Sequence, residues 1–164
     1  MKLSSGDVAI RSATEQDMQD IKCIASTYFL DTNGLEYSDC IVATLENRII
    51  GIACFKHTEC PELHTIAVHP NYRGKGIGAL LVRALGLTLC KGQECIYVRT
   101  TAPGFFEKVG FVTLENNMKK ELWTDCAGCD RFNNCKQAVM LLELRRGEYA
   151  DNGNHQHLRQ DQST

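Results

Sequence analysis

No apolar run in this chain of 164 residues is long enough to cross a lipid bilayer, so no membrane-spanning helix is expected. The segment that starts at Met1 also lacks the hydrophobic core of a secretory signal peptide. The net charge is only −2, so no general attraction to nucleic acids or membranes is expected. With 43% hydrophobic residues and no evident internal repeat, the sequence predicts a globular protein of the cytoplasm.

The chain divides into one predicted domain and a tail. The domain is expected to cover residues 1–145 and to include a cysteine-rich insert at 120–137. Residues 146–164 are polar and lack apolar periodicity, which predicts a disordered tail.

Cysteine, in contrast, is plentiful: there are nine, an odd number. In a reducing compartment this favours free thiols or metal ligands over a disulfide scaffold. Five cysteines lie in or beside apolar segments and are expected to pack in the core, namely Cys23, Cys40, Cys54, Cys90 and Cys95.

The remaining cysteines suggest a metal site. Cys126, Cys129 and Cys135 are close in the sequence, and a Cys-x-x-Cys turn can place two thiolates on one metal ion. Cys60 is the preferred fourth ligand, with His57 and Asp125 as weaker candidates. Zinc is expected ahead of an iron–sulfur cluster, in a structural role. The alternative is three free thiols or a redox-sensitive pair.

Hydrophobic patterns predict an order of strands and helices. A first helix is expected after Thr14, an N-cap whose capping partner would be Asp17, and a hairpin turn is expected at 46–48. Two further helices are expected from about 77 to 87 and from 103 to 109. The predicted strands are 8–11, 40–44, 49–55, 63–68, 95–100, 111–114 and 138–144.

The most informative stretch is a basic, glycine-rich turn, Arg73-Gly74-Lys75-Gly76-Ile77-Gly78, between a strand and a helix. The first backbone N–H groups of a helix have no intrahelical partner and lie at its positive end, so they bind phosphate. Glycines allow the backbone to come close to a ligand, and Arg73 and Lys75 add charge. The turn predicts a nucleotide-like ligand with a pyrophosphate.

Element order and motifs together resemble the GNAT superfamily of acyl-CoA-dependent N-acetyltransferases, from Val8 to Leu144. The hallmark (Gln/Arg)-x-x-Gly-x-(Gly/Ala) is present at 73–78, after the typical lead-in 66–70. The segment 104–111 matches the short helix and Gly-Phe ending of the family. The resemblance implies a mixed α/β fold, with a twisted, mostly antiparallel sheet of six or seven strands flanked by helices. The segment 100–106 resembles members of the N-acetylglutamate-synthase type.

By this resemblance, acetyl-CoA is the co-substrate, and its diphosphate binds the backbone amides of the glycine turn. The pantetheine arm would lie along the preceding strand, where the N–H of Ile66 would stabilise the oxyanion. The family usually has a bulge here, which opens a slot for the cofactor. The implied cofactor-binding residues are Ile66, Ala67, Val68, Arg73, Gly74, Lys75, Gly76, Ile77, Gly78 and Phe106.

Catalysis requires a base, because alkyl ammonium groups are mostly protonated at neutral pH. Glu62 stands six residues before Val68, where several family members carry this base; the alternative is a solvated glutamate. His64 could assist or be a packing residue. Arg99 could bind an acceptor carboxylate or face solvent. Phe106 stands where the family often has a tyrosine acid, so that acid is missing.

The sequence thus predicts an acetyltransferase that acts on the primary amine of a small molecule, with an amino acid preferred, by direct attack. A protein N-terminus or lysine is the alternative acceptor. A third interpretation is an acetyl-CoA-binding metal or redox sensor without turnover. No nucleic-acid or membrane partner is expected, and a homodimer is left open.

Overall fold

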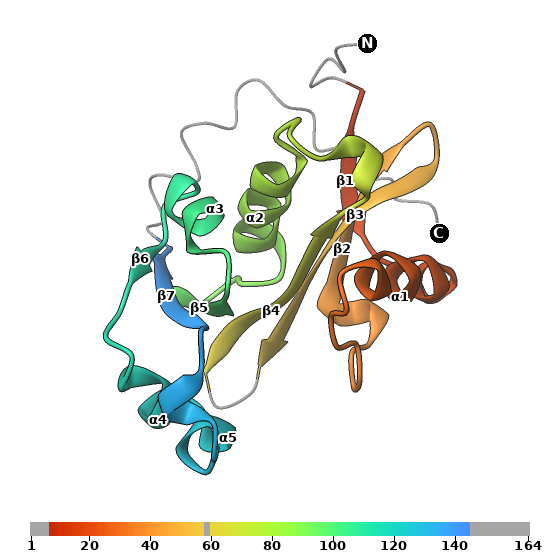
Figure 1. Ribbon diagram of the computed structural model, residues 1–164. Coiled ribbons are helices and arrows are strands. Elements are labelled where there is room, and N and C mark those ends of the chain that lie inside the picture. Colours follow the sequence, from red (N-terminus) through yellow and green to blue (C-terminus); the bar gives the residue numbers. More distant parts are fainter. Residues whose placement is uncertain (1–6, 58–59, 145–164) are drawn as a thin grey trace.

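The computed structural model describes residues 7–57 and 60–144, so the predicted tail at 146–164 lies outside the described residues. The described chain forms one mixed sheet of seven strands in the order β1-β2-β3-β4-β5-β7-β6, with helices on both faces (Figure 1). The strands are β1 (Ala9–Ser12), β2 (Cys40–Leu45), β3 (Arg48–His57), β4 (Pro61–Val68), β5 (Cys95–Thr100), β6 (Val112–Thr113) and β7 (Ala138–Glu143).

The helices differ in length and in how well the sequence predicted them. The main ones are α1 (Met18–Thr27), α2 (Ile77–Thr88) and α3 (Pro103–Lys108), and the short ones are α4 (Met118–Leu122) and α5 (Thr124–Ala127). Single 3-10 turns are η1 (Glu15–Asp17), η2 (Tyr37–Asp39), η3 (Pro70–Tyr72) and η4 (Phe132–Asn134). The first three helices were predicted, whereas α4 and α5 within the cysteine-rich segment were not.

Two apolar layers cover the sheet. On one face α1 buries Ile21 and Ile24 against β2, β3 and β4. On the other face α2 buries Leu81 and Leu85, and α3 adds Phe106 (Figure 1). Burial of each leucine or isoleucine side chain stabilises the folded state by about 1.5–3 kcal/mol. The buried residues recur at helical spacing, and this apolar stripe made α1 and α2 recognisable in the sequence.

Sheet pairing is antiparallel except between β4 and β5. These two strands run parallel, and within the described sheet their register contains the single pair Glu62 and Tyr97. The register of β3 and β4 also shifts at one point: Cys54 lies opposite Thr65, but Phe55 lies opposite Leu63. His64 is therefore the extra residue of a bulge in β4. The strand beyond the bulge no longer pairs with β5, and its edge is left open.

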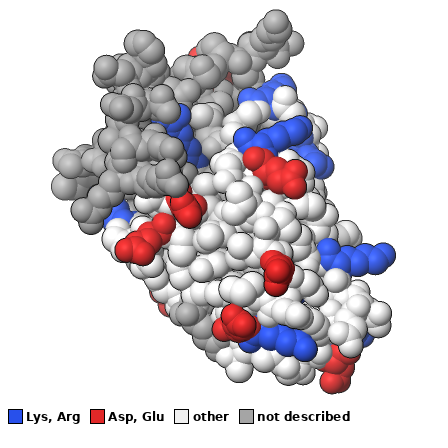
Figure 2. Space-filling model, turned by 90° about the vertical axis from the view of Figure 1, so that its left-hand side faces the viewer, with Lys and Arg blue, Asp and Glu red and all other residues white. Residues whose placement is uncertain are grey.

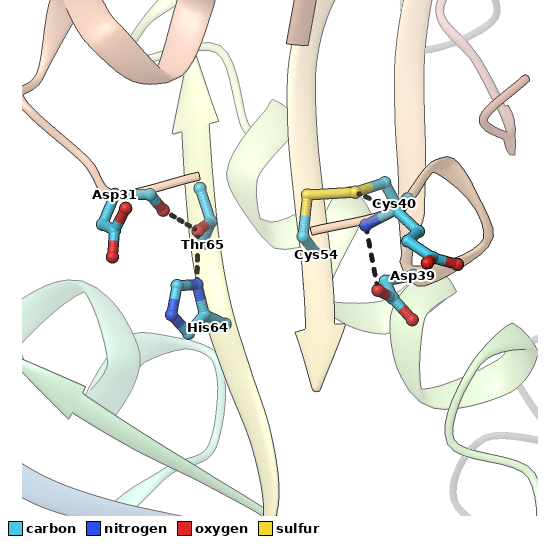
Figure 3. The surroundings of a disulfide bond; sticks show 7 residues. Asp31, Asp39, Cys40, Cys54, His64 and Thr65 are labelled. Carbon is cyan, nitrogen blue, oxygen red and sulfur yellow. Dashed lines mark hydrogen bonds between the residues drawn. A yellow bond between two sulfur atoms is a disulfide. The ribbon is translucent and has the colours of Figure 1, made fainter. Parts of the chain in front are cut away.

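One prediction about cysteine was wrong. Cys40 and Cys54 form a disulfide between β2 and β3 (Figure 3), although both were expected to be free core thiols. They lie directly opposite each other in the register, with their Cα atoms 4.1 Å apart, and both side chains are fully buried. The register of β2 and β3 therefore brings the two thiols together.

The surface carries charges of both signs. On the face shown in Figure 2, acidic and basic side chains are interspersed over a largely uncharged surface. Over the described residues, no helix combines the length and apolar character that a bilayer crossing requires.

Candidate active site

The glycine turn forms a solvent-exposed loop between η3 and α2. Arg73, Gly74, Lys75 and Gly76 are all exposed. Gly74 and Gly76 have φ values of +76° and +82°, the left-handed region that glycine adopts without strain. A Cβ atom added to either glycine would meet nothing within 4 Å. The turn thus leaves room for a ligand in front of the first N–H groups of α2.

The last two residues of the motif also serve the core. The side chain of Ile77 is buried beneath α2. A Cβ atom at Gly78 would lie 3.0 Å from the ring of Phe105, so this glycine allows α2 to pack against α3. Their backbone N–H groups still belong to the first turn of the helix, which is where an anion binds.

The open edge of β4 presents two of the three predicted backbone positions. The N–H of His69 donates to the carbonyl of Ile50 in β3 at 2.8 Å. Backbone groups alternate along a strand, so those of Ala67 also face β3, whereas those of Ile66 and Val68 face the opposite edge. That edge is the one which has separated from β5, and the chain continues from it through η3 into the glycine turn.

Phe106 is buried in the apolar core, with the rings of Phe105 and Phe111 at centroid distances of 4.9 Å and 5.2 Å. The structure therefore gives Phe106 a packing role.

Glu62 is a buried carboxylate at the end of β4 that still pairs with β5, just before the open edge, and only 4% of its surface is exposed. Arg99 of β5 holds both of its oxygens: Nε donates to Oε1 at 3.0 Å and Nη2 donates to Oε2 at 3.4 Å. Glu62 is therefore not the solvated residue that was the alternative interpretation. A carboxylate oxygen has more than one acceptor position, so these bonds leave capacity for a water molecule or an amine.

Arg99 is the centre of this cluster. Its Nη1 donates to Asp125 of α5 at 2.8 Å and to the sulfur of Cys126 at 3.4 Å, and its guanidinium lies 4.4 Å from the ring centroid of Trp123. Burial lowers the pKa of Arg99, but the hydrogen bonds to Glu62 and Asp125 outweigh it and the pKa is raised. Arg99 is thus neither a solvent-facing residue nor a free carboxylate receptor.

The predicted metal site is not formed. Among residues 7–57 and 60–144, no three histidine, cysteine, aspartate or glutamate side chains come together as ligands for a metal ion. Cys126 contacts Arg99, Cys60 packs against Trp123, and Cys129 is exposed. The pKa of Cys135 is lowered by a backbone hydrogen bond from Gln137 and by Lys119.

His64 is the bulge residue of β4, next to Thr65 (Figure 3). Its Nδ1 is 2.9 Å from the hydroxyl of Thr65, and that hydroxyl donates to the backbone carbonyl of Asp31 at 3.4 Å. Nδ1 of His64 is thus engaged with Thr65, and Nε2 takes no part in this contact. Burial lowers the pKa of His64, which favours the neutral imidazole.

Sequence reasoning missed three residues in this region. Trp123 and Asp125 had no pattern that linked them to β5, although Asp125 was considered as a metal ligand. Lys119 is fully buried, where its Nζ donates to the carbonyl of Gln137 at 2.9 Å beside the ring of Phe132. Lysine is rarely fully buried, and the charged residues that follow Lys119 give no sign of such burial in the sequence.

Comparison with known proteins agrees with this architecture. The model of the acetyltransferase (GNAT) domain matches residues 36–113. An uncharacterised N-acetyltransferase of Chlorobaculum tepidum is 27% identical over 155 residues, which cover 87% of this chain and 100% of that protein.

Two solved structures share the fold. N-acetylglutamate synthase from Neisseria gonorrhoeae, complexed with coenzyme A and N-acetyl-glutamate, has a TM-score of 0.66 at 20% identity over 87% of this chain. This chain spans 36% of that larger protein. Rv2747 from Mycobacterium tuberculosis, in complex with CoA and NLQ, has a TM-score of 0.62 at 23% identity, over 84% of this chain and 99% of that one. The domain match over residues 36–113, the curated relative and the shared fold together support a GNAT N-acetyltransferase.

Proposed function

We propose that the protein transfers an acetyl group from acetyl-CoA to the primary amine of a small molecule, with an amino acid as the preferred acceptor. The observation that carries this proposal is the continuity of two features. The open edge of β4 leads through η3 into a glycine turn that presents N–H groups and two cationic side chains.

These residues fit an acyl-CoA. The amides of 73–78, with Arg73 and Lys75, would bind the diphosphate. The outward backbone groups of Val68 and Ile66 would bind the pantetheine arm as a neighbouring strand does. The N–H of Ile66 would then face the thioester carbonyl and stabilise negative charge on its oxygen.

Glu62 is the proposed general base. It lies at the closed end of the same edge and would remove a proton from the acceptor ammonium through a water molecule. Arg99 keeps the carboxylate in place, and Nε2 of His64 would be a second proton acceptor when Nδ1 carries the ring proton. The amine nitrogen then forms a bond to the carbonyl carbon, and the carbon–sulfur bond breaks. With Phe106 buried, a water molecule is the proton source for the thiolate that leaves.

An amino acid is preferred as acceptor for two reasons. The segment 100–106 resembles the N-acetylglutamate-synthase type, and both structural neighbours described above were solved with coenzyme A together with a second small molecule. Because this chain spans only 36% of the synthase, the activity of the whole synthase carries over only as a proposal.

The test combines binding and turnover. Calorimetric titration with coenzyme A should show binding, and thiol release from acetyl-CoA should be followed with amino acids, polyamines and peptides. Turnover with amino acids supports the proposal, turnover with peptides alone replaces the acceptor, and binding without turnover indicates a sensor. Absence of coenzyme A binding would overturn the proposal.

A matched pair of variants tests the base. Glu62→Gln should lower turnover by about 100-fold or more while the Kd for coenzyme A changes little. Glu15→Gln, at an exposed position in η1, should behave like the wild type. Wild-type turnover by Glu62→Gln would remove Glu62 from this role.

A further inference from the structure

Tyr28 joins the end of α1 to β4 and to the glycine turn. It follows the last residue of α1, and its hydroxyl donates to the backbone carbonyl of Val68 at 2.6 Å, across 40 positions of sequence. The guanidinium carbon of Arg73 lies 5.5 Å from the centroid of the Tyr28 ring. A single side chain therefore contacts both the open edge of β4 and the glycine turn.

Both contacts fall on groups that would meet the coenzyme. The carbonyl of Val68 faces the open edge, and it keeps one lone pair after it accepts from Tyr28. Arg73 is exposed, so without the ring its side chain would sample many rotamers and lose that freedom on binding a phosphate. The face of an aromatic ring attracts a guanidinium and restricts those rotamers.

The chain after Tyr28 is also held to β4. Phe29 has a φ of +56°, and the N–H of Leu30 returns to the carbonyl of Ala25, which ends the helix. At the next residue, Asp31, the backbone carbonyl accepts from the hydroxyl of Thr65. These contacts fix the end of α1 beside β4, so the position of Tyr28 is well defined.

We propose that Tyr28 is a positioning residue for coenzyme A, which fixes the Val68 carbonyl through its hydroxyl and orients Arg73 towards the diphosphate through its ring. This inference rests on the proposed function. It adds a residue of α1, remote in sequence, to a site otherwise built from β4 and the turn.

The two contacts can be separated by substitution. Tyr28→Phe removes the hydroxyl and keeps the ring, and it should raise the Kd for coenzyme A about fivefold, the effect of one hydrogen bond. Tyr28→Leu removes both contacts and should raise the Kd about 10- to 20-fold. Tyr37→Phe, at an exposed tyrosine, is the control and should bind like the wild type.

A double-mutant cycle distinguishes positioning from a general structural effect. In the background of Arg73→Met, the Phe and Leu substitutions at Tyr28 should give the same Kd, because the ring has lost its partner. A Kd for Tyr28→Phe equal to the wild-type value, or a difference between the Phe and Leu variants that persists without Arg73, would overturn the inference. Titration of the wild type keeps the two proposals apart, since failure of the wild type to bind coenzyme A refutes the proposed function itself.

Discussion

The two ends of the open β4 edge are built in different ways. At the glycine turn, the proposed contacts come from backbone amides and from residues consecutive in the sequence. At Glu62, the contacts are made between side chains of β4, β5 and α5. Arg99 is 37 positions away from Glu62, and Asp125 is 26 positions away from Arg99. The first arrangement follows from local conformation, whereas the second exists only once β4, β5 and α5 have come together.

This difference explains why a coenzyme-binding turn can be recognised in a sequence more readily than an acceptor site. A helix start with glycines presents N–H groups whatever the rest of the fold does. An ion pair between distant strands depends on the register of the sheet and on which segment covers it. The following experiments test how far each end depends on its long-range contacts.

The largest effect is expected from Arg99→Met. Loss of the guanidinium leaves the buried carboxylate of Glu62 without its partner, and the free energy of unfolding should fall by about 3 kcal/mol in urea denaturation. The double variant Arg99→Met/Glu62→Met should recover most of this loss. Arg48→Met, at an exposed position, is the control. A loss no greater than that of the control would show that side-chain contacts do not hold this end together.

A smaller effect is expected from an ion pair between residues close in sequence. Hydrogen bonds from Arg11, together with one from the backbone N–H of Thr14, lower the pKa of Asp17 to about 2. Because the folded-state pKa is depressed, the stabilisation is complete above about pH 4 and is lost as the pH falls towards 2.

Urea denaturation of Asp17→Asn tests this pair. At pH 6 the variant should be about 1.5 kcal/mol less stable than the wild type, a value reduced because solvent reaches Arg11. The difference should shrink as the pH is lowered below 4. Asp20→Asn, an exposed neighbour in α1, should stay within about 0.5 kcal/mol of the wild type. A difference that does not depend on pH would refute the assignment.

The smallest effect is expected from metal removal. A structural zinc ion contributes on the order of 10 kcal/mol to folding, so its loss would be obvious. Since the thiols of Cys60, Cys126, Cys129 and Cys135 do not converge, a chelator should leave the midpoint of thermal unfolding unchanged. Elemental analysis of protein purified without chelator should find far less than one zinc ion per chain. Stoichiometric zinc would show that the cysteines of this segment are drawn together in solution.

Much of the sheet could be predicted because local signals define it. The hairpin turn is an example: Glu46 and Asn47 both adopt positive φ, and the strands on either side begin and end close to the predicted residues. The capping contact from the N–H of Thr14 to Asp17 is also confirmed, at 2.7 Å. The partner of Asp17, Arg11, was not predicted, because it lies in the strand before the cap.

The disulfide shows where such prediction ends. From the hairpin turn, simple counting places Cys40 opposite Ala53. A register shift between Ala43 and Thr44 moves the pairing by one residue and brings Cys40 opposite Cys54 instead. The bulge at His64 is equally invisible in the sequence. Both depend on how the strands curve against α1 and α2, and no local pattern encodes that curvature.

The interruption between β4 and β5 also has a consequence for folding. Where the central strands of a sheet separate, some backbone N–H and C=O groups lack a strand partner. In most sheets a neighbouring strand would form hydrogen bonds with these groups. A ligand that fills the gap supplies those hydrogen bonds from outside the chain. Folding equilibrium and ligand occupancy are then linked, and at a ligand concentration 100 times Kd the folded state gains about 2.7 kcal/mol. The supply of ligand in the cell would then influence how long each copy of the protein survives.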